Sequence, residues 1–114
     1  MGDRGNIVIK QDGGKGEIYL YSHWGGEELP KTLRAALVRG KGCWDDSPYL
    51  ARIIFCEMVK GHEMSETGFG ISTYECDNEH DLLIVDPDKQ TVTAGAKTLT
   101  FLEFTDPGVP LPVI

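Results

Sequence analysis

The sequence predicts an α+β fold: a mostly antiparallel sheet of about five or six strands with two helices on one face, in the order ββααββββ. Two short runs of strand-forming residues open the chain, two helical patterns follow, and four further strand candidates fill the second half. The 114 residues, 40% of them hydrophobic, match the usual size of one domain. We expect a single α+β domain over residues 1–106 and an extended, proline-rich tail over residues 107–114.

The first two strands are expected over residues 6–11 and 17–23, joined as a hairpin through a glycine-rich connection. Side chains alternate along a strand. In the second strand, one side should therefore carry Ile18, Leu20 and Ser22, and the other side Tyr19, Tyr21 and His23.

Two helices should follow. The first has Pro30 in its first turn, carries an apolar stripe and ends at Gly40. The second should begin with Ser47 as its N-cap and Pro48 at its first position. Its residues 49–60 are apolar around most of the circumference, which is typical of a largely buried helix.

The remaining chain is predicted as β-structure, with strands over residues 69–74, 82–85, 90–93 and 97–104. The continuous apolar run at 82–85 indicates a central strand. Pro87 suits the second position of a type I turn that connects this strand to the next.

The composition restricts the class of protein. A net charge of −7 argues against direct binding to nucleic-acid phosphates and favours a soluble protein or one that meets a basic partner. No stretch approaches the roughly 18 apolar residues of a membrane span, and no signal-peptide pattern opens the chain. The three cysteines form no disulfide pattern. We expect a cytoplasmic protein that does not contact a membrane.

The junction between the second strand and the first helix holds the most unusual residues. Two adjacent glycines permit a close approach, and a helix N-terminus supplies free N–H groups. Glu27 and Glu28 stand where an anion would bind, however, so the segment is not a phosphate loop. We favour Trp24 as a core anchor over Trp24 as a ligand contact. The candidate binding residues are Tyr21, His23, Trp24, Gly25, Gly26, Trp44, Arg52 and Glu57.

No catalytic, metal-binding or cofactor-binding set is assigned from the sequence. Cys43 lacks the surroundings of a known cysteine hydrolase, and Cys56 should be buried within a helix. Cys76 and His80 do not form zinc half-sites. Glu57 either needs a buried partner such as His23 or Arg52, or pairs at the surface, which we favour.

Several segments taken together resemble a family of small proteins found in phage, prophage, actinobacterial and archaeal genomes. They are residues 2–6 (GDRGN), 19–26 (YLYSHWGG), 49–55 (YLARIIF), 70–72 (GIS) and 76–78 (CDN). The resemblance covers roughly residues 2–93 and implies an origin in mobile elements. It implies no catalytic residues.

Three functions fit these observations. We favour a non-enzymatic binding protein that engages a host protein or a small nucleotide-like ligand, for example in counter-defence. A small hydrolase or transferase that uses His23 with Glu57 or a cysteine is the first alternative, and an acidic nucleic-acid mimic is the second. A homo-oligomer is compatible with all three.

Overall fold

The computed structural model describes residues 2–114 and contains six strands and three α-helices. In chain order they are β1 (Gly5–Gln11), β2 (Gly16–Ser22), α1 (Leu29–Arg39), α2 (Ser47–Met58), β3 (Phe69–Ser72), β4 (Leu83–Asp86), β5 (Thr91–Ala94), β6 (Lys97–Thr100) and α3 (Phe101–Thr105). The predicted α+β class and the order of its first eight elements are confirmed.

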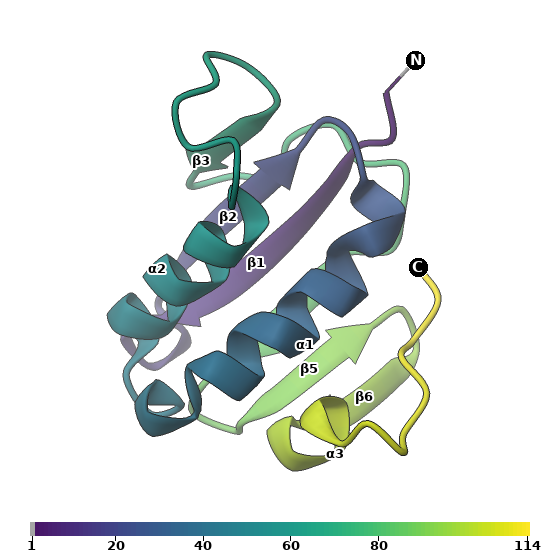
Figure 1. Cartoon of the computed structure of the whole chain (residues 1–114). Coiled ribbons are helices and arrows are strands. Elements are labelled where there is room, and N and C mark those ends of the chain that lie inside the picture. Colours follow the sequence, from purple (N-terminus) through teal and green to yellow (C-terminus); the bar gives the residue numbers. More distant parts are fainter. Residues whose placement is uncertain (1) are drawn as a thin grey trace.

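The strands form one open sheet in the order β3-β2-β1-β4-β5-β6, so that β3 and β6 are its edges. Only β1 and β4 run parallel; every other neighbouring pair is antiparallel. Helices α1 and α2 lie side by side across one face of the sheet (Figure 1). Within residues 2–114, no helix is long and apolar enough to cross a bilayer.

The core lies between the sheet and the helices. Alternate residues of the strands, such as Ile7, Ile9 and Leu20, point toward the helices and are fully buried there. Both helices turn their apolar sides toward these strands, with Leu33 and Leu37 from α1 and Leu50 and Ile54 from α2. The predicted alternation in β2 is correct, because Leu20 and Ser22 are buried and Tyr19 and Tyr21 are half-buried on the opposite face.

The connection from β3 to β4 crosses the face of the sheet that carries no helix. The fully buried Asn6 fixes it: Nδ2 donates to the carbonyl oxygens of Cys76 and Asp77, both at 3.2 Å, and Oδ1 accepts from the Cys76 N–H at 3.2 Å. Ile7 points into the helix side of the sheet, so its neighbour Asn6 points to the other.

Two local predictions are wrong. Residues 97–104 are not one strand, since β6 ends at Thr100 and α3 begins at Phe101. A reciprocal capping box causes this break: the Glu103 N–H donates to Thr100 Oγ1 and the Thr100 N–H donates to the Glu103 carboxylate. The N-cap of α2 is Asp46 rather than Ser47, because Asp46 Oδ1 accepts from the Tyr49 N–H at 3.2 Å.

The tail over residues 107–114 contains no helix or strand but is packed against the domain. Val109, Leu111 and Ile114 contact the hydrophobic core. Arg34 on α1 donates to the carbonyl oxygen of Phe104 at 2.7 Å and to that of Val109 at 2.6 Å. The tail is thus held by Arg34, by the three apolar side chains and by a contact of 3.1 Å between Nδ1 of His80 and the Ile114 carbonyl oxygen.

Candidate functional site

The aromatic residues at the end of β2 form a contiguous strip. The Tyr21 hydroxyl hydrogen-bonds Nδ1 of His23 at 2.8 Å, and the His23 ring meets the Trp24 ring edge-on, with centroids 4.7 Å apart. Trp24 is 55% exposed, so the expectation that it anchors the core is wrong. The chain turns away from the sheet directly after β2, which leaves the indole on the surface.

Trp24 covers the start of β3. The His23 N–H donates to the carbonyl oxygen of Gly68 at 2.8 Å, which extends the β2–β3 ladder by one pair. A Cβ at Gly68 would lie 2.9 Å from Cζ3 of Trp24, and the φ of Gly68 is +103°. Only glycine fits this position without strain.

Gly25 and Gly26 form a tight internal corner. Gly25 has a φ of +85°, and Gly26 is buried against the backbone of Asp3 and the ring of His80. The Gly26 N–H donates to the Asp3 carbonyl at 2.7 Å, and the Glu27 N–H donates to the Asp3 carboxylate at 3.2 Å. The protein's own Asp3 therefore takes the place of a bound anion at this corner.

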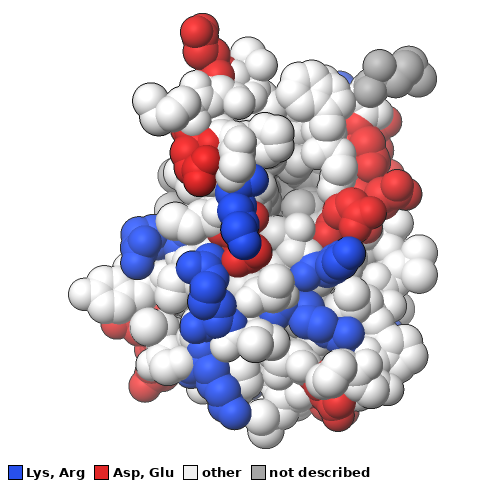
Figure 2. Space-filling model, viewed as in Figure 1, with Lys and Arg blue, Asp and Glu red and all other residues white. Residues whose placement is uncertain are grey.

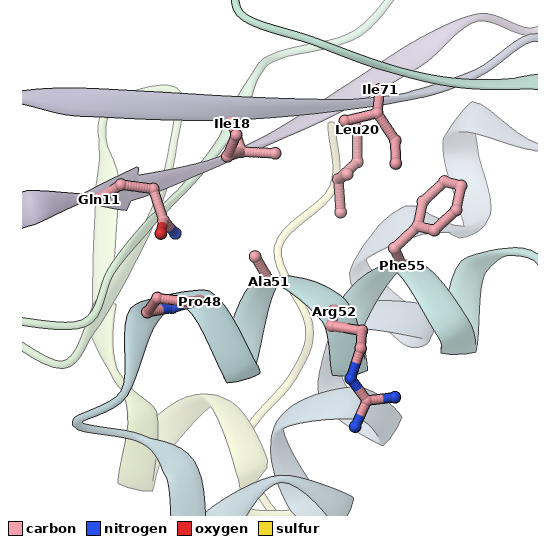
Figure 3. A pocket seen from close by; sticks show the side chains of 8 residues that line it. All are labelled: Gln11, Ile18, Leu20, Pro48, Ala51, Arg52, Phe55 and Ile71. Atoms are coloured by element: carbon pink, nitrogen blue, oxygen red, sulfur yellow. The ribbon is translucent and has the colours of Figure 1, made fainter.

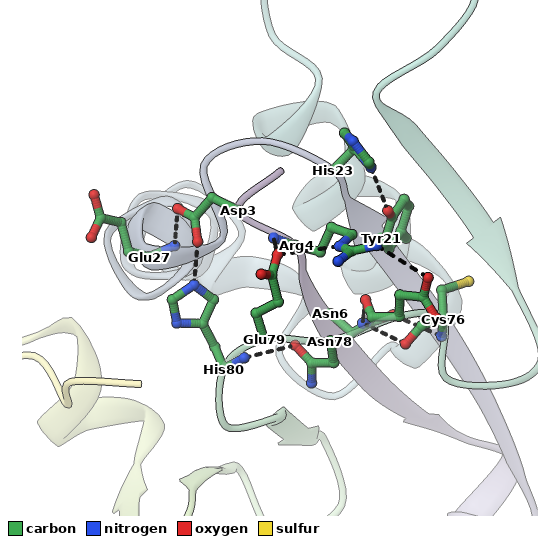
Figure 4. A network of polar contacts seen from close by, with 11 residues as sticks. Asp3, Arg4, Asn6, Tyr21, His23, Glu27, Cys76, Asn78, Glu79 and His80 are labelled. Atoms are coloured by element: carbon green, nitrogen blue, oxygen red, sulfur yellow. Dashed lines mark hydrogen bonds and ion pairs between the residues drawn. The ribbon is translucent and has the colours of Figure 1, made fainter. Parts of the chain in front are cut away.

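A polar network surrounds this corner (Figure 4). Nε2 of His80 bonds the Asp3 carboxylate, while Nδ1 lies 3.1 Å from the carbonyl oxygen of Ile114. The hydrogen bond to Asp3 raises the pKa of His80, and the hydrogen bonds from His80 and the Glu27 N–H lower the pKa of Asp3. Arg4 extends the network through an ion pair with Glu79 at 3.2 Å. These contacts join the two ends of the described chain.

The other candidate residues lie apart from this junction. Trp44 is buried, and its Nε1 donates to the Leu37 carbonyl at 2.9 Å. Glu57 forms an ion pair with Arg39 at 3.0 Å, in agreement with surface pairing. Among the bonds of residues 2–114, none joins His23 to Glu57 or to a cysteine. The catalytic alternative therefore gains no support from these groups.

Arg52 lies instead at a pocket between α2 and the edge of the sheet (Figure 3). The pocket has a volume of about 330 Å³ and is lined by Gln11, Ile18, Leu20, Pro48, Ala51, Arg52, Phe55 and Ile71. This volume lies at the lower end of the range for ligand pockets. Arg52 is the only charged residue among these eight. Its guanidinium points away from the strands at the rim in Figure 3.

The pocket opens beside an unprotected sheet edge. The edge strand β3 (Phe69-Gly70-Ile71-Ser72) contains no charged residue and no proline, whereas the other edge strand, β6, contains Lys97. Ile71 is 59% exposed. Trp24, which contacts Gly68, adds a further exposed apolar side chain beside β3, and Met64 and Tyr74 are exposed in the segments that precede and follow this strand. Exposed apolar side chains at an unprotected sheet edge are typical of interaction sites.

Basic residues gather over the helices (Figure 2). Residues 29–60 hold six of the 11 Lys and Arg side chains, namely Lys31, Arg34, Arg39, Lys41, Arg52 and Lys60. The same span holds three acidic residues, Asp45, Asp46 and Glu57, so its net charge is 6 − 3 = +3. This local positive charge weakens the case for an acidic mimic of nucleic acid.

Sequence reasoning found Arg52 but missed the pocket and its other seven lining residues. Comparisons of the chain with protein-family models, with curated proteins and with solved structures found no match. The resemblance to a phage-related family stays a prediction. The candidate site therefore depends on the geometry of this chain alone.

Proposed function

We propose that this protein is a non-enzymatic binding protein that engages another protein through the pocket beside β3. The observation that carries the proposal is the coincidence of an apolar pocket with an uncharged, exposed strand edge. Burial of apolar surface is the main favourable term in protein association. An exposed strand edge without charged residues or proline promotes aggregation unless another chain covers it. A dedicated protein partner would cover the edge of β3.

A protein partner fits the pocket better than a nucleotide-like ligand does. The lining is almost wholly apolar, and its two polar side chains are Gln11 and, at the rim, Arg52. Nucleotide sites use backbone N–H groups and several polar side chains to hold phosphates. A host protein as partner agrees with the proposed mobile-element origin and with a role such as counter-defence.

The test compares two equally exposed apolar residues. Ile71→Lys places a charge at the pocket, and Val38→Lys places the same charge on α1, where Val38 is 55% exposed against 59% for Ile71. Tagged wild type and both variants are used for affinity capture from host cells, and the captured proteins are quantified by mass spectrometry. Binding is then repeated with the purified partner.

We expect one partner to be retained by wild type and by Val38→Lys and to be lost by Ile71→Lys. A partner that binds Ile71→Lys as tightly as wild type would refute the proposed surface. Capture of a nucleotide-like small molecule, seen by native mass spectrometry and insensitive to Ile71→Lys, would support the alternative ligand.

A further inference from the structure

We infer, on the basis of the proposed function, that the partner contributes an extended segment that pairs with the outer edge of β3. The segment would carry an apolar residue and an acidic residue two positions apart. Its backbone would continue the sheet, the apolar side chain would fill the pocket and the carboxylate would meet Arg52. This is strand addition, in which main-chain bonds give affinity and side-chain pockets give specificity.

The hydrogen-bond register of β3 identifies the backbone groups that are free to pair. The bond from the His23 N–H to the Gly68 carbonyl makes these two residues a hydrogen-bonded pair. Such pairs recur at every second residue of an antiparallel ladder, so Gly70 and Ser72 also turn their N–H and C=O groups toward β2. Phe69 and Ile71 therefore direct theirs outward, and no strand of residues 2–114 occupies that side.

The direction of the Ile71 side chain determines where an incoming side chain would lie. Ile71 is opposite the buried Leu20 and so lies on the side of the sheet that α2 covers. A residue paired with Ile71 would place its own side chain on that same side. There it meets the pocket wall formed by Phe55 and Ala51. An apolar side chain is required at this position.

The positive charge of Arg52 at the rim of the pocket accounts for the acidic residue of the incoming segment. Arg52 is exposed, its Nη1 lies 3.8 Å from Sγ of Cys56, and no carboxylate pairs with it within residues 2–114. The next side chain of the incoming strand on the α2 side comes two residues away. Because the Arg52 side chain points away from the strands in Figure 3, its long, exposed side chain must turn toward the sheet edge to meet a carboxylate there. This charge complementarity favours an acidic partner segment over a second copy of the β3 edge, which carries no acidic residue.

The experiment uses the full chain as bait for a displayed library of random nine-residue peptides. Selected peptides are synthesised with and without N-methylation of the residue expected to face Ile71. We expect enriched peptides to share the apolar and acidic pair two positions apart. Bound peptide should slow amide exchange at Phe69 and Ile71, while N-methylation should weaken binding by about tenfold or more.

Variants separate the two parts of the proposal. Arg52→Gln should weaken the binding of the acidic peptides several-fold and leave the binding of peptides with a neutral residue at that position unchanged. If Ile71→Lys abolishes partner binding, the proposed function stands. Strand addition is nevertheless refuted if N-methylation of the peptide has no effect on its binding, or if the Phe69 and Ile71 amides stay unprotected. It also fails if the library returns no binder, or if the free protein is a dimer with these amides protected. The proposed function fails when Ile71→Lys keeps the partner.

Discussion

A Cβ added to Gly68 would lie 2.9 Å from Cζ3 of Trp24, so the indole and the first residue before β3 are fitted to each other. This relationship gives the exposed Trp24 a structural partner. The ring rests on backbone that also receives the His23 N–H. It thereby links the strand-to-helix junction, which the sequence marks as unusual, to the sheet edge at which we place the binding surface.

Gly68→Ala should destabilise the fold by about 1 to 2 kcal/mol, because alanine is strained at positive φ. The substitution should also displace the exposed indole. Denaturant unfolding measures the first effect, and the NMR signal of the Trp24 indole N–H measures the second. Gly14→Ala is the control, since Gly14 has a φ of +88° and nothing within 4 Å of the added Cβ. An equal indole shift in both variants would contradict the contact.

Asn6→Ala should cost about 2 to 3 kcal/mol, because it leaves three part-buried backbone groups of the β3–β4 connection without their Asn6 partners. Asn6→Asp has the same shape but cannot donate to the two carbonyl oxygens when ionised, so it should be destabilising at neutral pH. Urea unfolding measures both changes. Asp77→Ala, in the same connection but with an exposed side chain, should change stability by less than about 0.5 kcal/mol. Equal effects of Asn6→Ala and Asp77→Ala would show that Asn6 does not hold the connection.

Arg34→Met should release the tail while keeping most of the side-chain volume on α1. The variant loses the bonds to the Phe104 and Val109 carbonyls, so amide exchange over residues 105–114 should quicken by about tenfold or more. Hydrogen exchange with mass spectrometry resolves this region from the sheet. Lys31→Met, on an exposed position of the same helix, should leave tail exchange unchanged. Slow tail exchange in Arg34→Met would mean that the apolar contacts of Val109, Leu111 and Ile114, with the contact between His80 and the Ile114 carbonyl, hold the tail without Arg34.

The fold class follows from patterns that are local in sequence, and the candidate site does not. Alternation in β2 and the apolar run at Leu83 and Val85 are sufficient to place strands, because each strand's own side chains record which face is buried. The end of β6 at Thr100 also has a local cause, the capping box formed by Thr100 and Glu103. The β-forming residues around these two positions led to the prediction of one continuous strand.

The errors at the site have a tertiary cause. Trp24 and Trp44 are both aromatic residues beside turns, yet one is exposed and the other is buried, because only Trp44 is enclosed between α1 and Phe101. The pocket draws residues from β1, β2, α2 and β3, and no short segment contains its pattern. Its position depends on where β3 ends along β2, which is a property of strand register.

The pairing of His80 with Asp3 makes stability depend on pH in a defined window. The pKa of His80 is raised by Asp3, so its contribution is fully present below the ordinary value of 6.5 and is lost as pH rises through the folded-state pKa. The pKa of Asp3 is lowered, so its contribution is present above the ordinary value of 3.8 and is lost as pH falls through the folded-state pKa. The stability that His80→Gln removes should be greatest between the ordinary pKa values of 3.8 and 6.5 and should decline as pH rises from 6.5 through the folded-state pKa of His80.

An NMR titration of the His80 imidazole tests directly whether Asp3 raises the pKa of His80. In wild type the ring should titrate above 6.5, and Asp3→Asn should lower that pKa while it preserves an acceptor for the Glu27 N–H. The same substitution should flatten the pH dependence of the difference between wild type and His80→Gln, since the charge that stabilises the imidazolium is gone. Titration of His80 at or below 6.5 in wild type, or an unchanged pKa in Asp3→Asn, would show that the ion pair does not hold the two chain ends together.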